Sequence, residues 1–277
     1  MKYFFKILLV FPLISSCGGN MYNDISSKNS AAALLEDAKN ALDDQDYSTA
    51  ITKILEMQSS NLDSYMTCRT TDGRRNCPRE ILAGAYAGKC GFNFLTFIGT
   101  ISSSSGAVFK FLMNTFTSTT ISPDDCYEAQ KVIETIGTGS ALTSDQQIFM
   151  ALLGMAKIGV YLRDEADTDQ DGATDVIFNS CDTIDIAGVS SGISDTNVKQ
   201  VITGLGLFLT YSASLSSSGS ATTDLSAISA VCGAACNVTD PDSPALDAAA
   251  VATFRDIMKS LLYGIETCDP ISPLCCP

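Results

Sequence analysis

The chain has 277 residues with 31 acidic and 17 basic side chains, a formal net charge of −14 at pH 7, and no histidine. Such a negative surface repels nucleic acid and anionic lipid headgroups, and the lack of imidazole excludes the His-dependent catalytic sets. Hydrophobic residues make up 45% of the chain, which excludes a disordered tail and suffices for one large domain or two modest ones.

The first residues have the layout of a signal peptide. Lys2 and Lys6 precede the apolar stretch from Ile7 to Ile14. A bilayer core about 30 Å thick needs about 20 apolar residues as helix, so this stretch is too short for a permanent membrane span. We therefore expect residues 1–16 to be an export signal that is removed.

A cysteine follows this segment in the context Ile14-Ser15-Ser16-Cys17-Gly18. The aliphatic residue, the two small residues and the cysteine resemble the lipobox of bacterial lipoproteins. This resemblance implies that Cys17 is lipidated and that the protein is anchored to the outer membrane by lipid, facing the periplasm or the cell surface. The alternative is an ordinary secretory signal followed by a coincidental cysteine. Each buried methylene contributes about 0.8 kcal/mol, so several acyl chains hold a protein stably at a membrane.

The cysteine count agrees with export. Without Cys17, the 11 cysteines become an even set of ten, which in an oxidising compartment predicts disulfides. The connectivity of ten cysteines does not follow from sequence, and the simplest pair is Cys68 with Cys77, which flank a short turn-rich segment. A zinc site is the alternative use of clustered cysteines, but spacings such as Cys232-x3-Cys236 without any histidine give it little support.

Helical periodicity begins near residue 31. Residues 17–30 are small and polar without a hydrophobic period, which predicts a flexible tether. Apolar residues then recur every three or four positions over 31–42 and 47–57, with an acidic turn at 43–46, which predicts an αα-hairpin. Another helix should begin at Pro78, since proline is favoured in the first turn.

The hairpin resembles a tetratricopeptide repeat (TPR). The positions that carry the resemblance are the family's small, turn and large packing positions, here Ala38, Asp46, Tyr47, Ala50 and Ile54. Small side chains let two helices approach closely while a large one fills the adjacent groove. The pattern departs from the family at Leu62, where a proline is usual, and no second repeat in phase is visible. The resemblance implies TPR-like helical hairpins over residues 31–122, and a generic helical hairpin is the alternative.

The C-terminal region, residues 123–277, contains a coarser repetition. Cys126 and Cys181 each begin a unit with a Gly/Ser break. The pairs Ser144-Asp145 and Ser194-Asp195 are predicted to cap the apolar helices at 148–162 and 198–209. A further amphipathic helix is predicted within 244–265. We predict an all-α fold of stacked helical hairpins, either a TPR-like α-solenoid or a compact helical bundle, stapled by disulfides.

Three segments are apolar on most faces: 92–101, 108–116 and 202–209. Each has about ten residues, where a span needs about 20, so we predict core helices and not membrane spans. Their phenylalanines could instead line a pocket for a small apolar ligand; these are Phe92, Phe94, Phe97, Phe109, Phe111 and Phe116.

An acidic loop is the sharpest local motif. Its alternating residues, Asp167, Asp169, Asp171, Ala173 and Asp175, with Gly172 at the turn, have the spacing of a calcium loop. The loop resembles those of EF-hand and dockerin proteins, which implies carboxylate ligands and a backbone carbonyl from Ala173. It departs from them at the twelfth position, where Phe178 cannot bind a metal; Asn179, Asp182 or Asp185 could close the shell instead. The alternative to a structural Ca²⁺ site is an acidic, solvated turn.

The motifs of several enzyme classes fail. Gly188-Val189-Ser190-Ser191-Gly192 matches the nucleophile elbow of hydrolases, but the chain has no histidine to act as its base. Phosphate-loop and dinucleotide-binding patterns are absent, and no carboxylate pair stands out among the acidic residues. We therefore expect no enzymatic activity.

These observations favour a membrane-anchored lipoprotein that acts as a non-enzymatic scaffold or protein-interaction module in the cell envelope. Its expected partner is another envelope protein, because stacked helical repeats present extended binding surfaces. The alternative is a periplasmic binder of a small molecule or lipid, resembling the TPR lipoproteins associated with transporters. Hydrolysis of an envelope polymer is a minor third hypothesis.

Overall fold

The computed structural model describes residues 30–59, 66, 69–71, 74–101, 107–181, 185–186, 189–190, 192–214, 225, 227–230, 232–260 and 263–265. The predicted signal peptide, Cys17 and Cys68 lie outside these residues. The chain divides into two compact units, Met1–Ile81 and Leu82–Pro277. In both units the described regular structure is almost entirely helical, and disulfides join described cysteines, so the predicted all-α, disulfide-stapled fold is confirmed.

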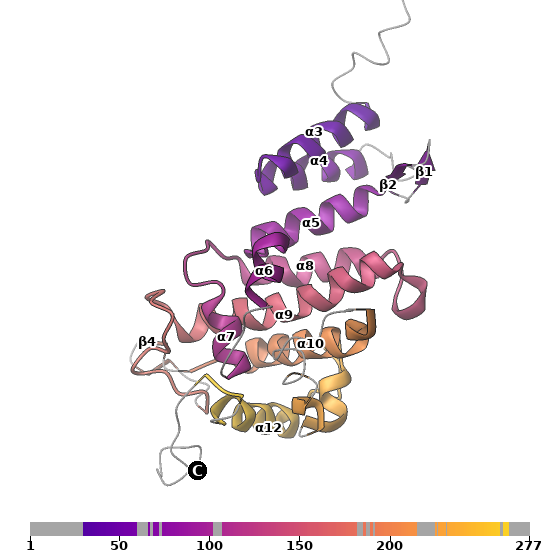
Figure 1. Cartoon of the computed structure of the whole chain (residues 1–277). Coiled ribbons are helices and arrows are strands. Elements are labelled where there is room, and N and C mark those ends of the chain that lie inside the picture. Colours follow the sequence, from indigo (N-terminus) through magenta and orange to yellow (C-terminus); the bar gives the residue numbers. More distant parts are fainter. Residues whose placement is uncertain are drawn as a thin grey trace, which may run out of the picture. The chain divides into compact units, whose positions relative to one another are not determined.

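The first unit contains the predicted helical hairpin, formed by α3 (Ala31–Asp43) and α4 (Tyr47–Ser59) (Figure 1). Ser30 caps α3 by accepting a hydrogen bond from the Ala33 N–H at 3.2 Å. The turn places Gln45 at a φ of 61°, and the Asp46 carboxylate accepts the Thr49 N–H at the start of α4. Tight pairing of the two helices follows from their buried small and branched side chains, Ala38, Ala50 and Ile54.

Two short antiparallel strand pairs were not predicted from the sequence. They are β1 (Arg69–Thr71) with β2 (Arg74–Asn76), and β3 (Asp185–Ile186) with β4 (Val189–Ser190). Runs of two or three residues are too short to show the alternation of a strand, so sequence periodicity does not detect them.

The second unit is organised around one buried helix, α9 (Ser144–Ala166). Its main partner is α10 (Asp195–Tyr211), and α7 (Val108–Asn114) and α8 (Pro123–Glu134) pack on its other sides. Figure 1 shows α9 between α8 and α10, with α12 (Ala248–Lys259) beyond α10. The remaining elements are α5 (Pro78–Cys90), which begins at the end of the first unit, α6 (Phe94–Ile101), and the 3-10 helices η2 (Gly139–Ala141), η3 (Ser212–Ser214) and η4 (Gly233–Asn237).

The helix starts follow from local capping. Ser194 caps α10 by accepting the Asn197 N–H at 3.1 Å, as its position in the sequence predicts. The prediction for α9 was wrong by one residue, because Thr143 is its N-cap and forms a capping box with Gln146. A capping box satisfies two N–H groups reciprocally, which favours Thr143 over the adjacent serine.

The apolar segments are core, with one exception. Residues 108–116 and 202–209 bury most of their side chains, including Phe109 and Phe116. In α6, however, only one face is buried: Phe97 is in the core while Phe94 and Ile98 are 42% and 43% exposed. No helix within the described ranges is both long enough and apolar enough to cross a membrane.

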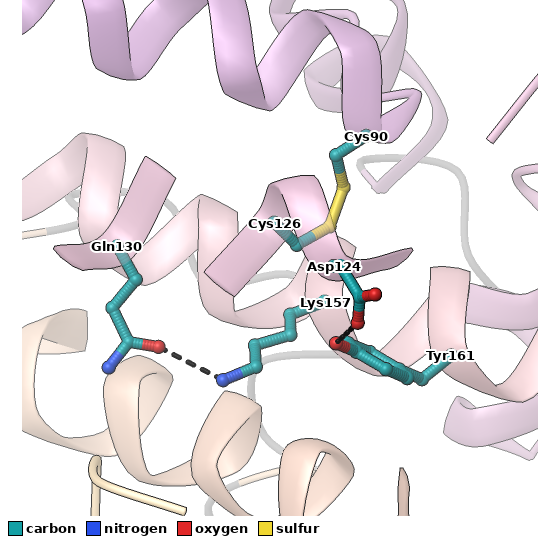
Figure 2. Close-up of a disulfide and its surroundings, with 6 residues drawn as sticks. All are labelled: Cys90, Asp124, Cys126, Gln130, Lys157 and Tyr161. Carbon is teal, nitrogen blue, oxygen red and sulfur yellow. Dashed lines mark hydrogen bonds between the residues drawn. A yellow bond between two sulfur atoms is a disulfide. The ribbon is translucent and has the colours of Figure 1, made fainter. Parts of the chain in front are cut away.

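Two disulfides join described cysteines, Cys90 with Cys126 and Cys232 with Cys236. The first ties the last residue of α5 to the first turn of α8 (Figure 2). Cys77 and Cys181 are disulfide-bonded as well. Because Cys68 lies outside the described residues, its pairing with Cys77 stays a prediction.

Candidate functional site

The acidic loop leaves the C-terminal end of α9, where Asp167 is the C-cap residue. The Asp167 side chain is buried, Asp169 is exposed, and Asp175 is half-buried. One carboxylate oxygen from each of these three residues lies within 4.8 Å of the others, which is the kind of cluster that can hold a cation. The structure thus brings together three of the four predicted carboxylates.

The loop backbone wraps around the Asp167 carboxylate. The N–H groups of Asp171 and Gly172 donate to Oδ1 of Asp167 at 2.9 and 3.3 Å. This turn requires a left-handed conformation at Gly172, with a φ of 85°, which glycine adopts without steric cost. A hydrogen bond of 2.7 Å from the Asp175 N–H to the Ala166 carbonyl closes the loop.

Two predicted ligands have other local contacts. The Asp171 carboxylate accepts the Ala173 N–H at 2.7 Å and is not part of the three-residue cluster. Asp175 accepts hydrogen bonds from the hydroxyl and the N–H of Thr168 at 2.5 and 3.2 Å, so its orientation is fixed within the loop.

The twelfth position is a packing position. Phe178 is only 7% exposed and belongs to the hydrophobic core, so it anchors the end of the loop. Of the residues that could replace it as a ligand, Asn179 accepts the Cys181 N–H at 3.2 Å, Asp182 lies outside the described residues, and Asp185 lies in β3.

The electrostatics of the loop favour a cation. Burial raises the pKa of the Asp167 carboxyl, the two backbone N–H donors oppose this shift, and the Asp171 and Asp169 carboxylates reinforce it. The neighbouring acids therefore disfavour charge on Asp167 in the absence of a counterion. A divalent cation with oxygen preference would relieve this repulsion, with the three carboxylates as its protein ligands and backbone carbonyls or water completing its shell.

A second polar centre lies inside the helical core, and the sequence analysis did not single it out. Lys157, in the middle of α9, is completely buried. Its ammonium or amine group donates to Gln130 Oε1 of α8 at 2.9 Å and to Thr203 Oγ1 of α10 at 2.8 Å. Figure 2 shows the contact with Gln130 beside the disulfide. The available signal was a single charged residue within the otherwise apolar run of residues 148–162.

One helical turn further along α9, Tyr161 forms a second link to α8. Its hydroxyl donates to the Asp124 carboxylate at 3.3 Å (Figure 2). Burial and the nearby Asp124 charge raise the pKa of this phenol, so Tyr161 stays neutral and acts as a donor. Asp125, the residue after Asp124, forms an ion pair with Lys89 of α5, with 3.0 Å between the Lys89 Nζ and the Asp125 carboxylate oxygen.

The remaining predicted sites are distributed as follows. Cys17, the predicted lipidation site, lies outside the described residues. Ser190 of the elbow-like motif lies in β4, which α10 does not follow directly, since that helix begins at Asp195.

Comparison with protein-family models, with curated proteins and with solved structures finds no match for this chain.

Proposed function

We propose that this protein is an outer-membrane lipoprotein, anchored through lipid on Cys17 and facing the periplasm or the cell surface. The observation that supports this most strongly is the use of its cysteines. Cys90 pairs with Cys126 and Cys232 with Cys236, and setting aside Cys17 in the lipobox-like sequence leaves an even number of cysteines for disulfides. Disulfides of this kind persist in exported proteins, because the cytosol keeps thiols reduced.

We propose further that the anchored protein acts without catalysis, as a scaffold or interaction module for another envelope protein. The TPR-like hairpin supports this role, since its three diagnostic packing residues, Ala38, Ala50 and Ile54, are each fully buried at the helix crossing. Stacked helical hairpins expose one repeated face to partners. The most unusual amine in the described residues, that of Lys157, is sealed in the core and engaged by two acceptors, so it is placed to stabilise packing.

The pocket alternative receives less support. Four of the six phenylalanines that could line an apolar ligand site, Phe92, Phe97, Phe109 and Phe116, are buried and pack in the core. Their rings contact one another and other core rings, with centroids 5.2 Å apart for Phe92 and Phe97 and 5.6 Å apart for Phe109 and Phe254. Such contacts favour a filled core over a lined cavity.

The acidic loop is proposed to bind Ca²⁺ as a structural ion. The clustered oxygens of Asp167, Asp169 and Asp175 support this assignment, and the glycine turn holds them together. Extracellular calcium sites bind at about 0.1 to 1 mM, so a site with three carboxylates can fill outside the cytoplasm.

The anchor is tested by feeding bacteria an alkyne-labelled palmitate and detecting label on the expressed full chain. We expect the wild type to carry the label and to fractionate with membranes. Cys17→Ala should lose both properties, while the matched variant Cys181→Ala should keep the label. An unlabelled wild type released into the medium would instead identify an ordinary secretory signal.

The interaction role needs a separate experiment. A photo-crosslinking amino acid at Leu55, an exposed apolar position of α4, should capture one defined envelope protein in living cells. The same group at Asp145, exposed at the start of α9, serves as the control position. If Leu55 captures nothing and denaturation of the purified protein releases a lipid or small molecule, the ligand-binding alternative replaces the scaffold.

A further inference from the structure

The buried amine of Lys157 lies where α8, α9 and α10 meet. Its exposed fraction is 0%, and both of its hydrogen-bond acceptors, the Gln130 amide oxygen and the Thr203 hydroxyl, are uncharged and buried. The Thr203 hydroxyl donates a hydrogen bond to the Gln200 carbonyl at 3.0 Å, so its oxygen is available to accept from the amine. Within the part of the chain that the structure describes, the amine therefore has two acceptors and no directly bonded carboxylate.

This arrangement matches a neutral amine. A neutral amine has two N–H donors, which the two acceptors satisfy, whereas an ammonium group has three. Among the described residues, the third direction faces the Tyr127 ring, whose centroid lies 4.9 Å from Nζ, and a ring face is a weaker partner for an ammonium group than a carboxylate. Burial lowers the pKa of Lys157 to about 7, with Glu134 and Asp240 opposing that shift.

None of the charged groups in the described residues around the amine forms a hydrogen bond with it, because both of its acceptors are uncharged. The helix α10 contributes only the uncharged Gln200 and Thr203 to this network, and Tyr161 of α9 is engaged by Asp124. Glu134 of α8 and Asp240 of the segment that follows η4 act electrostatically on the amine itself. Lys131 and Asp242 act on Tyr127, whose ring lies against the amine. Burial raises the pKa of the Glu134 carboxyl, which weakens it further as a counterion.

One side chain connects the amine to the segments that cover it. The Gln130 amide nitrogen donates to the Glu134 carboxylate and to the Thr239 carbonyl, both at 2.8 Å, while its oxygen accepts from Lys157. Gln130 thus ties the last turn of α8 and the segment after η4 to the amine at once. The first turn of α8 has a separate attachment to α5 through the Cys90–Cys126 disulfide (Figure 2). The Lys89–Asp125 ion pair holds the same two helices together.

From this geometry we propose that Lys157 and Gln130 form a pH-sensitive latch. While the amine is neutral, residues 130–134 stay docked on α9 and residues 238–242 stay attached to Gln130, and both segments loosen when the amine is protonated. The Cys90–Cys126 disulfide holds the first turn of α8, so the opening is confined to the C-terminal end of this helix. Protonation places a full charge in a site without a bonded carboxylate, and opening admits water to it. Acidification of the surroundings therefore releases this surface, and neutral or alkaline pH closes it.

Backbone hydrogen exchange of the full chain tests the latch. Exchange rates at pH 5.5 and pH 8, each corrected for the intrinsic rate, give the protection of residues 130–134 and 238–242. A group that titrates near 7 when covered and near 10.4 when hydrated increases opening by about tenfold between these two pH values. We therefore expect protection in these two segments to be about tenfold lower at pH 5.5 than at pH 8, and protection in α9 to change little.

Three variants identify the responsible group. Lys157→Met should show equal protection at both pH values, because its side chain has a similar length and no charge to titrate. Lys131→Met removes a neighbouring lysine that is half-exposed, and Glu134→Gln removes the nearest carboxylate; both should keep the pH dependence. The proposal is wrong if wild-type protection does not change with pH, or if Lys157→Met retains the change.

A measurement on the unaltered protein covers the case in which Lys157→Met does not fold. The ¹³Cε chemical shift of labelled lysines reports the charge of each amine directly. We expect one lysine to lose its proton near neutral pH, where the other lysines remain charged. A protein in which every lysine stays charged above pH 9 has no such latch.

Discussion

Gly154 of α9 and Gly204 of α10 face each other where the two helices cross. A Cβ atom added at Gly154 would lie 2.4 Å from the Gly204 carbonyl oxygen, and one added at Gly204 would lie 2.7 Å from the Gly154 carbonyl oxygen. Both contacts are with backbone, which cannot move aside as a side chain can. The close approach of the two central helices of the second unit therefore requires glycine on both.

Gly154→Ala should lower the free energy of unfolding by about 3 kcal/mol or more, since it forces the α9–α10 pair apart in a close-packed core. Thermal or urea unfolding measures the loss. Gly99→Ala is the matched control: nothing lies within 4 Å of its added Cβ, and in helix α6 alanine is favoured by up to about 1 kcal/mol. Equal stability of both variants would contradict the crossing.

Arg255→Met should destabilise the second unit strongly. The Arg255 guanidinium, in α12, donates to the carbonyls of Ser180 and Ile193 at 2.6 and 2.7 Å and to the Asp195 carboxylate at 2.7 Å. Losing the donor to two carbonyls costs on the order of 2 to 4 kcal/mol. Asp195→Asn should cost about 1 kcal/mol or less, because that carboxylate is 59% exposed. Urea midpoints of the two variants compare these effects, and an equal loss in both would place the energy in the ion pair alone.

The two disulfides should differ in their contribution to stability. Cys90 and Cys126 are 36 residues apart, whereas Cys232 and Cys236 are 4 apart. By chain entropy, closing the larger loop is worth about 4 kcal/mol and the smaller one about 2 kcal/mol. Unfolding of the two double-alanine variants measures both values. A larger loss for the short loop would show that contacts in the native state outweigh the entropy of the unfolded chain.

The titration of Lys157 also predicts how global stability depends on pH. Its pKa in the folded protein is lowered to about 7 from 10.5, so the unfolded chain binds more protons between these values. The contribution of this group to the free energy of unfolding therefore rises as pH increases above about 7, with a slope of up to about 1.4 kcal/mol per pH unit. Urea unfolding of the wild type and of Lys157→Met from pH 6 to 9.5 tests this. The free energy of unfolding of the wild type, minus that of the variant, should increase as the pH rises. A constant difference would mean that Lys157 is charged throughout.

Calcium should raise the melting temperature if the acidic loop binds it. At 10 mM Ca²⁺, a dissociation constant of 0.1 to 1 mM stabilises the fold by about 1.4 to 2.7 kcal/mol. Asp167→Asn should abolish the rise, because Asp167 is the buried member of the carboxylate cluster. Asp256→Asn, at an exposed position of α12, should leave it unchanged. Absence of any shift in the wild type would identify the loop as a solvated turn.

Local signals in the sequence predicted the helices well. The small residues Ala38 and Ala50 marked the hairpin crossing, and Ser194 marked the start of α10, because packing and capping act over a few residues. The glycine turn and the alternating acids likewise predicted the loop at the end of α9. Its detailed geometry was less predictable, since the Asp171 carboxylate accepts the Ala173 N–H instead of joining the cluster.

What the sequence did not reveal depends on distant residues. The pairing of Cys90 with Cys126 is one of many possible connectivities, and only the packing of α5 on α8 selects it. Similarly, Lys157 becomes unusual only because Gln130 and Thr203, 27 and 46 residues away, meet at its amine. The exposure of Phe94 and Ile98 reflects which face of α6 meets the core, and an apolar run has no periodicity that specifies this face.

The segment Tyr263–Ile265 connects parts of the second unit that are made much earlier. The Thr174 hydroxyl of the acidic loop donates to the Ile265 carbonyl at 2.9 Å, across 91 positions of sequence, and the Phe109 N–H at the start of α7 donates to the Tyr263 carbonyl at 3.0 Å. Neither bond can form until the ribosome has added these late residues. A nascent chain that ends before residue 263 therefore has an acidic loop and an α7 that still lack these partners, and both are completed only when the ribosome has passed Ile265.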